Sequence, residues 1–324
     1  MTSLLRVEDL VVAYNLESGA KLRAIDNISF TLDKGEVLGL VGESGCGKST
    51  LALTIMRLLP PEGTIEKGKI WFDGIDLARI REEEMRRIRW KRISIVFQGS
   101  MNALNPLHKV GDQIAEAILL HKPNVSREEA LRMAGDLLEH VGIPRERIKN
   151  YPFEFSGGMR QRVMIAMALA LNPDLIIADE PTTALDVIVE SQILSLLKRI
   201  KQEFGLSMIV ISHDLSIVSE LANKIAIMYA GKIVEMGSIR DVYKTPKHPY
   251  TKALLDAFPR VDEPRRRLYA IPGTPPNLIN PPSGCRFHPR CPFAEPICRE
   301  KEPEPYQVGD GHYSMCHLVK EGVL

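Results

Sequence analysis

The 324-residue chain balances 42 Lys and Arg against 41 Asp and Glu, and its formal net charge of +1 excludes a global field for binding nucleic acid. Its length exceeds the ~250–300 residues over which one hydrophobic core usually grows, which favours a large domain with an appendage. The longest apolar run, Val163 to Leu171, has nine residues, so we expect no membrane-spanning helix. The charged opening residues predict no signal peptide, and hence a cytoplasmic chain whose cysteines begin as thiols.

Strand-like stretches open the chain. Leu4–Tyr14 and Ala24–Leu32, followed by Lys69–Phe72, are separated by turns, which predicts a small antiparallel sheet beside the core. Apolar runs that alternate with helical stretches predict βα units around a largely parallel sheet, and therefore an α/β core. These runs are Val37–Val41, Ile93–Phe97, Leu175–Ala178 and Ser207–Ile211.

Two further parts of the chain have their own character. Between Gln98 and Pro152, the stretches Val110–His121 and Arg127–Val141 have helical periodicity without strand signals, which indicates a helical insertion. Prolines then mark a boundary near Tyr250, because eight lie before residue 246 and fourteen lie from there to residue 305. We expect this tail to be irregular unless a covalent or metallic group holds it together.

A glycine-rich segment follows the first apolar run and precedes a helical stretch that begins at Leu51. Its residues 42–50, Gly-Glu-Ser-Gly-Cys-Gly-Lys-Ser-Thr, have P-loop spacing in the context that this motif requires. The N–H groups of such a loop converge on phosphate oxygens; Lys48 adds a charge, and the Ser49 hydroxyl can ligate Mg²⁺. A turn that merely joins strand to helix is the alternative. The residues expected at a nucleoside triphosphate are Gly42, Ser44, Gly45, Cys46, Gly47, Lys48, Ser49 and Thr50.

Polar residues follow the other apolar runs, at the sheet edge where parallel folds bind ligands. Asp179 can hold the hydration shell of Mg²⁺, and Glu180 can polarise water. His213 can hydrogen-bond a terminal phosphate, and Gln98 suits a neutral ligand to Mg²⁺ or water. A solvated acidic strand end and a structural histidine are the alternatives.

Residues 155–162, which precede a long helical stretch, read Phe-Ser-Gly-Gly-Met-Arg-Gln-Arg. This segment resembles the signature of ATP-binding cassette (ABC) ATPases. The leucine and glutamine common at its ends are Phe155 and Met159 here. The three residues that donate hydroxyl and N–H groups to the γ-phosphate are intact, so we expect function to survive. They are Ser156, Gly157 and Gly158.

The resemblance extends over residues 1–250. The family's motifs follow in order as P-loop, Gln98, signature, Asp179-Glu180, a D-loop ending at Asp186, and His213. It implies a P-loop ABC ATPase with a RecA-like core, an antiparallel β subdomain and an α-helical subdomain at about 99–160. A Pro- and Cys-rich extension, expected to be irregular, occupies 251–324.

The same resemblance implies roles for single residues. In this family two cassettes sandwich two ATP molecules, each site pairing one P-loop with the other subunit's signature. Glu180 is then the base or orienter of the attacking water, His213 holds the γ-phosphate with Lys48, and Asp186 helps communication across the dimer. Tyr14 lies where an adenine-stacking aromatic is expected, with an ordinary core aromatic as the alternative. The implied Mg²⁺ ligands are Ser49, Gln98 and Asp179.

Four cysteines lie within thirty-two residues of the Pro-rich tail, namely Cys285, Cys291, Cys298 and Cys316. Their spacings differ from the C-x₂-C pairs usual at structural zinc sites, and the expected compartment disfavours disulfides. Four thiolates suit an iron–sulfur cluster. Zinc stays open, with His288, His312 or His317 as substitute ligands, and so do four unligated thiols.

Three stretches of the tail, residues 248–255, 271–276 and 284–292, have a further resemblance. They are similar to the C-terminal extension of dipeptide and oligopeptide importer ATPases. The resemblance implies a peripheral ATPase on the cytoplasmic face of the membrane that powers peptide uptake. Its partners would be a second, homologous ATPase, two permeases and, indirectly, an extracytoplasmic solute-binding protein. A coupling helix of the permeases would enter a groove formed around Gln98 and the helical insertion.

Related members serve nickel and other solutes, and some carry a [4Fe–4S] cluster on four such cysteines. Two other classes of function are alternatives: a soluble cassette ATPase acting on DNA or ribosomes, and a regulatory module that binds ATP without hydrolysis. The first would be expected to show tandem cassettes or basic extensions, and the intact Glu180 and His213 argue against the second.

Overall fold

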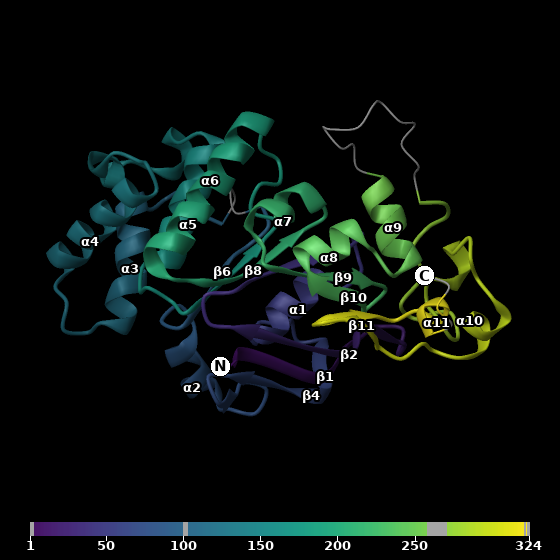
Figure 1. The fold of residues 1–324 in the computed structure, drawn as a ribbon. Helices are drawn as coiled ribbons and strands as arrows, with labels where there is room; N and C mark the ends of the chain where they lie inside the picture. Colours follow the sequence, from purple (N-terminus) through teal and green to yellow (C-terminus); the bar gives the residue numbers. More distant parts are fainter. Residues whose placement is uncertain (1–2, 100–102, 258–270, 321, 323–324) are drawn as a thin grey trace. The chain divides into compact units, whose positions relative to one another are not determined.

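The computed structural model describes residues 3–99, 103–257, 271–320 and 322 (Figure 1). The chain forms two compact units. Unit 1 consists mainly of Leu32–Val37 and Arg79–Ile211, and unit 2 of Leu4–Thr31, Leu38–Ala78 and Ser212–Leu324. Residues 100–102, near the start of the expected helical subdomain, and 258–270, in the expected extension, lie outside the described residues. Among the described helices, none is long and apolar enough to cross a membrane.

Unit 1 contains parallel strands in the order β8-β7-β6. They are β6 (Ile93–Val96), β7 (Leu175–Asp179) and β8 (Ser207–Ser212). Every residue of β7 is buried, and its continuous apolar run is typical of a parallel strand that is covered on both faces. In the register, Ile177 of β7 lies opposite Ile95 and Ile209. The prediction of parallel strands at these positions is confirmed.

Helices make up the rest of unit 1. They are α2 (Glu82–Ile88), α3 (Val110–His121), α4 (Arg127–His140), α5 (Gly157–Leu169) and α6 (Val187–Phe204), with 3₁₀ turns η2 (Arg145–Lys149) and η3 (Pro152–Glu154). The helices α3, α4 and α5 pack on one another and lie side by side in Figure 1. Their buried residues follow the helical period: α3 buries Ile114 and Ile118, and α4 buries the small Ala130 and Ala134. The predicted helices of the insertion are confirmed.

Unit 2 begins with an antiparallel sheet in the order β2-β1-β4-β5. Its strands are β1 (Ser3–Asn15), β2 (Lys21–Asp33), β4 (Gly63–Phe72) and β5 (Ile75–Asp76). In the β1–β4 register, Leu5 lies opposite Phe72 and Tyr14 lies opposite Gly63. The predicted antiparallel sheet is confirmed, although β4 begins six residues before Lys69, where the strand was expected to start.

The other strands of unit 2 follow the order β11-β12-β10-β9-β3. They are β3 (Val37–Val41), β9 (Lys224–Tyr229), β10 (Lys232–Ser238), β11 (Tyr306–Gly309) and β12 (His312–Ser314). The helical elements are α1 (Lys48–Ile55), α7 (Leu215–Leu221), α8 (Ile239–Lys244), α9 (Pro249–Asp256), η4 (His288–Arg290), α10 (Pro296–Glu300) and α11 (His317–Lys320).

The described part of the Pro- and Cys-rich tail is more ordered than the sequence predicted. Its strand β12 pairs with β10, with Glu235 opposite Ser314. The strands β11 and β12 have only four and three residues, so their pairing partners define them more than their own sequence does.

Candidate functional site

The glycine-rich loop of unit 2 runs from the end of β3 to the start of α1, and close backbone approach explains its glycines. A Cβ atom on Gly42 would lie 2.1 Å from the carbonyl oxygen of Met228. Gly47 has a φ of +109°, and a Cβ atom there would lie 2.5 Å from the carbonyl oxygen of Ala24. Neither position accommodates a side chain without movement of the backbone.

Lys48 is buried over this loop. Its Nζ donates to the carbonyl oxygens of Gly42 at 2.7 Å and Glu43 at 3.1 Å. A phosphate oxygen can therefore replace one of these acceptors while the ammonium group stays over the loop. The neighbouring Cys46 is also buried, and burial raises the pKa of its thiol in spite of the charge on Lys48. Cys46 is therefore a protonated, packed side chain.

Tyr14 lies beside the end of the same loop. Its hydroxyl is 3.2 Å from the hydroxyl of Thr50, in the first turn of α1. The half-buried ring is thereby anchored at the phosphate loop. The other expected phosphate contact of unit 2, His213, is exposed between β8 and α7, and the next residue, Asp214, caps α7 by accepting from the N–H of Ser216.

Glu180 is the centre of a polar cluster in unit 1. The amide nitrogen of Gln98 donates to Glu180 Oε2 at 2.7 Å, and the Thr183 hydroxyl donates to the same oxygen at 2.8 Å. The Glu180 backbone is left-handed, with a φ of +47°, and its N–H donates to the carbonyl oxygen of Ile211 at 2.9 Å. Non-glycine residues in this conformation are uncommon and cluster at functional sites. The buried Asp179 directly precedes this turn as the last residue of β7.

The signature segment begins α5. Ser156 is its N-cap, with Oγ accepting from the N–H of Met159 at 3.4 Å. Since the cap uses only a lone pair, the Ser156 hydroxyl retains its hydrogen as a donor. The Arg147 guanidinium lies 4.6 Å from the ring centre of Phe155, which is buried. The structure accounts for both departures from the usual signature, because the cap uses only the backbone of Met159 and Phe155 is a core residue.

Asp186 caps the neighbouring helix α6. Its Oδ1 accepts from the N–H groups of Ile188 at 3.1 Å and Val189 at 3.0 Å. The start of α6 packs closely on the signature helix, because a Cβ atom on Gly158 would lie 2.4 Å from Val189 Cγ1. The signature and Asp186 therefore lie at neighbouring helix N-termini in unit 1. Beside them, the apolar side chains of Val187 and Ile188 are 81% and 73% exposed.

The four tail cysteines line one small cavity of unit 2. The cavity also has His248, Phe287, His288 and His317 in its wall. Burial, with contributions from the neighbouring cysteines, raises the pKa of Cys285 to about 12 and that of Cys316 to about 11. The pKa of Cys291 is raised by burial and by Cys298. The raised pKa values keep Cys285, Cys291 and Cys316 as protonated thiols, and a metal bound by them would have to displace their protons.

The histidines divide into two groups. His288 and His317 line the cavity, where His288 Nδ1 lies 3.0 Å from the Cys285 carbonyl oxygen and His317 Nε2 lies 2.8 Å from that of Lys301. His312 instead lies on β12, with Nε2 2.8 Å from the buried Glu235. The prediction of His312 as a substitute ligand is therefore wrong, because the strand pairing turns it toward this carboxylate. Among the described residues, no group of three or more His, Cys, Asp or Glu is arranged to hold a single metal ion.

The sequence did not predict two polar partners of the site residues Glu180 and Glu43. Thr183 follows Glu180 by three residues, and its N–H donates to the Glu180 carbonyl oxygen at 3.2 Å. The tight turn after the glutamate is the sequence feature that could have predicted this partner. The other partner is Arg290, whose guanidinium pairs with Glu43 of the phosphate loop at 2.6 Å. Nothing local to either residue predicts this pair, because 247 positions separate them.

Comparison with known proteins places these sites in a family. Residues 25–183 match the family described as ABC transporter, and residues 234–298 match the family described as oligopeptide/dipeptide transporter, C-terminal region. The chain is 48% identical over 323 residues to the oligopeptide transport ATP-binding protein OppD of Bacillus subtilis (strain 168), covering 98% of this chain and 90% of that protein. It is 45% identical over 317 residues to the dipeptide transport ATP-binding protein DppD of Escherichia coli (strain K12), covering 97% and 96%.

Solved structures support the same fold. The ATP-binding cassette MJ0796, solved as a dimer in a post-hydrolysis state with ADP and Pi, matches with a TM-score of 0.65 and 29% identity, over 73% of this chain and 99% of that one. The structure of cbiO1 from Clostridium perfringens, part of the complex cbiONQ, matches with a TM-score of 0.64 and 28% identity, over 76% and 92%. These family matches and full-length relatives show that the chain belongs to the ABC transporter ATPases, as the ATP-hydrolysing subunit of a transporter of the oligopeptide and dipeptide group.

Proposed function

We propose that this chain hydrolyses ATP at a site built from the residues named above and so powers uptake of di- and oligopeptides through separate permease subunits. The observation that carries the proposal is the Glu180 cluster. Gln98 and Thr183 both donate to one oxygen of this carboxylate, which orients it at the end of β7. A carboxylate held in this way is suited to orient the attacking water and accept its proton.

The other roles follow from the donor chemistry. Lys48, the loop N–H groups and His213 would bind the phosphates, and Tyr14 would stack on the adenine. Ser49, Gln98 and Asp179 would hold Mg²⁺, since hydroxyl, amide and carboxylate oxygens are the ligands this ion prefers. Mg²⁺ would neutralise charge that develops on the phosphate oxygens.

Steady-state ATPase assays on Glu180→Gln test the catalytic role. We expect hydrolysis to fall by roughly 10²–10⁴-fold, the usual contribution of a general base, while ATP still binds. Glu139→Gln is the matched control, because this exposed glutamate lies on α4. Equal activity of the two variants would remove Glu180 from the mechanism.

We propose that the active form is a dimer of two cassettes, with a homologous ATPase as the partner. The Ser156 hydroxyl retains a donor hydrogen for a γ-phosphate, and Gly157 and Gly158 add N–H groups at the start of α5. Asp186 and the exposed Val187 and Ile188 supply a neighbouring surface for the partner. With ATP, the Glu180→Gln chain should elute as a dimer with its partner, and Ser156→Ala should weaken this association. An ATP-independent dimer would contradict the proposal.

Two exposed apolar features of unit 1 support docking to permeases. Leu107, Leu120 and Phe153 are exposed on and beside the helical insertion. A surface hollow next to α3 is lined by the apolar Ala115, Leu119 and Leu120 and by the charged Asp112, Glu116 and Arg127. We propose that this face receives the coupling helix at the cytoplasmic face of the membrane. Leu120→Glu should reduce copurification with the permeases without reducing ATP binding by the isolated chain.

Peptide cargo is proposed over nickel or another small solute. Its test is the ATPase activity of the complete transporter in vesicles, with the solute-binding protein present. Stimulation by di- or oligopeptides would support the proposal, and stimulation by Ni²⁺ alone would show nickel to be the cargo instead.

For domain organisation, we propose a nucleotide-binding domain at 1–250, with its helical subdomain at about 99–160, and an extension at 251–324 that carries the cysteines.

We propose that the extension holds a [4Fe–4S] cluster on Cys285, Cys291, Cys298 and Cys316. The four side chains line one cavity, which fits a shared metal group. Four thiolates around a single zinc would place their sulfurs about 3.8 Å apart, from a Zn–S distance of 2.3 Å in a tetrahedron. Among the described residues, no group of His, Cys, Asp or Glu is arranged to hold a single ion, so metal analysis has to decide between the cluster and zinc.

Metal analysis of anaerobically purified protein tests the cluster. Iron and acid-labile sulfide near four each per chain, with a visible absorption band, are the expected result. Cys298→Ser should lose both. Zinc alone would make the tail a structural zinc site, and a folded, active chain without metal would contradict the cluster.

A further inference from the structure

The second residue of the phosphate loop, Glu43, is held by the cysteine-rich segment. Arg290 pairs with its carboxylate through both terminal nitrogens, Nη1 to Oε2 at 2.6 Å and Nη2 to Oε1 at 2.9 Å. The Glu43 N–H also donates to the hydroxyl of Tyr250 at 3.0 Å. The Arg290 side chain is only 4% exposed and that of Glu43 is 25% exposed, so the pair is largely shielded from solvent.

Arg290 is itself fixed from several sides. Its Nε donates to the carbonyl oxygen of Pro272 at 2.8 Å, and its guanidinium lies 5.7 Å from the ring centre of Tyr229. The next residue is Cys291. The rings of Tyr229, Tyr250 and Phe287 pack on one another with centre distances of 4.6, 5.2 and 5.4 Å, and Phe287 lines the cysteine cavity. Packed contacts therefore connect this cavity to the phosphate loop.

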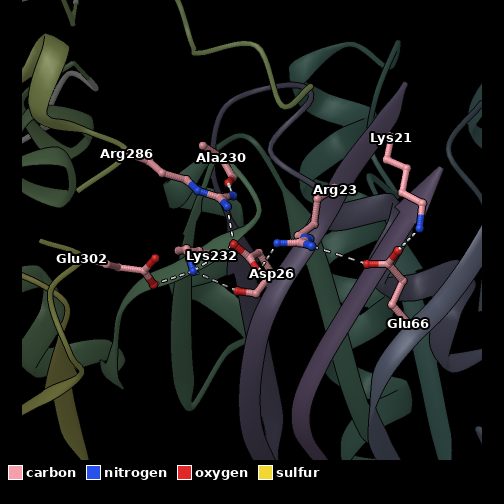
Figure 2. A network of polar contacts seen from close by, with 8 residues as sticks. All are labelled: Lys21, Arg23, Asp26, Glu66, Ala230, Lys232, Arg286 and Glu302. Atoms are coloured by element: carbon pink, nitrogen blue, oxygen red, sulfur yellow. Dashed lines mark hydrogen bonds and ion pairs between the residues drawn. The ribbon is translucent and has the colours of Figure 1, made fainter. Parts of the chain in front are cut away.

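A second connection runs through Arg286, which follows Cys285. Figure 2 shows its guanidinium donating to the Ala230 carbonyl oxygen and to the Asp26 carboxylate, which also pairs with Lys232. The residue after Ala230, Gly231, donates its N–H to the Cys46 carbonyl oxygen of the phosphate loop at 2.9 Å. Arg290 therefore contacts the phosphate loop directly, through Glu43. Arg286 is connected to the loop through the turn at Ala230 and Gly231.

We propose that Arg290 is a positioning residue for the phosphate loop, and that the cysteine site and the nucleotide site are coupled through its pair with Glu43. A carboxylate in a loop that binds a polyanion opposes binding unless a cation neutralises it and holds it in place. Metal bound by the cysteines orders the segment that presents Arg290, so it strengthens nucleotide binding. By linkage, nucleotide then strengthens metal binding. The coupling rests on the proposed metal site, whereas the role of Arg290 does not.

Equilibrium binding of Mg·ADP to the full chain, followed by calorimetry, tests the role of Arg290. We expect Arg290→Ala to weaken binding 5–30-fold, and Arg290→Lys to weaken it less, because a lysine keeps the charge but not the bidentate geometry. In Glu43→Gln the opposing charge is absent, so Arg290→Ala added to Glu43→Gln should change affinity less than threefold. If Arg290 were purely structural, Arg290→Ala would weaken Mg·ADP binding equally with Glu43 and with Gln at position 43. That result would overturn the role, and so would a change in affinity of less than twofold in both Arg290→Ala and Arg290→Lys.

The coupling has its own test. The dissociation constant of Mg·ADP is compared between metal-loaded chain and chain stripped by chelator under reducing conditions, with metal content measured on each sample. We expect at least threefold tighter binding by the loaded chain, and no such difference in Arg290→Ala. Equal affinities would overturn the coupling while leaving the metal site in place. A chain that binds no metal would overturn both the cluster and the coupling, and the Glu43 and Arg290 variants would still decide the role of Arg290.

Discussion

Loss of the charge on Asp26 should destabilise unit 2 far more than loss of a peripheral charge in the same network (Figure 2). Asp26 lies between Arg286 and Lys232, and the exposed fractions of the three side chains are 14%, 8% and 8%. Lys232 has a second partner in Glu302 at 2.6 Å, so Asp26→Asn leaves mainly Arg286 as an uncompensated buried cation. Breaking such a pair typically costs about 3–5 kcal/mol, and we expect about 3.

Glu66→Gln is the matched control at the edge of this network. Glu66 pairs with Lys21 at 2.7 Å and Arg23 at 3.6 Å, whose side chains are 64% and 51% exposed. Exposed pairs contribute about 0–1 kcal/mol. One kcal/mol corresponds to about 2–4 °C in melting temperature for a unit of 150–250 residues, so Asp26→Asn should lower it by at least about 6 °C and Glu66→Gln by less than about 4 °C.

The assay is thermal unfolding followed by circular dichroism, at low salt and in roughly 1 M NaCl, where the screening length is about 3 Å. Salt should remove the effect of Glu66→Gln and leave most of that of Asp26→Asn, because solvent ions do not reach the buried pair. Equal shifts for the two variants, or an Asp26→Asn shift that salt abolishes, would refute the reasoning.

Three other substitutions separate close packing, capping and stacking. Gly42→Ala should abolish nucleotide binding, because its Cβ would lie 2.1 Å from the Met228 carbonyl oxygen. A Cβ on Gly45 has nothing within 4 Å, so Gly45→Ala should lower the free energy of unfolding by only about 1–2 kcal/mol, from backbone strain, in an unfolding titration. Asp186→Ala should lower stability by about 0.5–2 kcal/mol through loss of the α6 cap, and Asp186→Asn should retain most of it in the same titration. Tyr14→Ala should weaken ATP binding by at least about fivefold if the ring stacks on adenine, whereas Tyr14→Phe should bind within about twofold in a calorimetric titration; equal affinities for both would remove the stacking role.

Local sequence determined much of the cassette. The apolar run Leu175–Ala178 predicts a buried parallel strand because both faces of such a strand must be covered, and β7 is buried throughout. The P-loop spacing of residues 42–50 predicts a glycine-rich loop between a strand and a helix, and the loop lies between β3 and α1. These features depend on residues that are neighbours in the chain, so a pattern in one segment suffices to predict them.

Tertiary structure alone decided how the tail is arranged. The sequence left open an iron–sulfur cluster, zinc with His288, His312 or His317 as substitute ligands, and four unligated thiols. In the structure, β12 pairs with β10, His312 lies against Glu235, and the four cysteines line one cavity. It also decided the pairs Arg290–Glu43 and Arg286–Asp26, which join residues 247 and 260 positions apart. No local periodicity encodes such contacts, because a charged side chain is buried only where the folded chain supplies its partner.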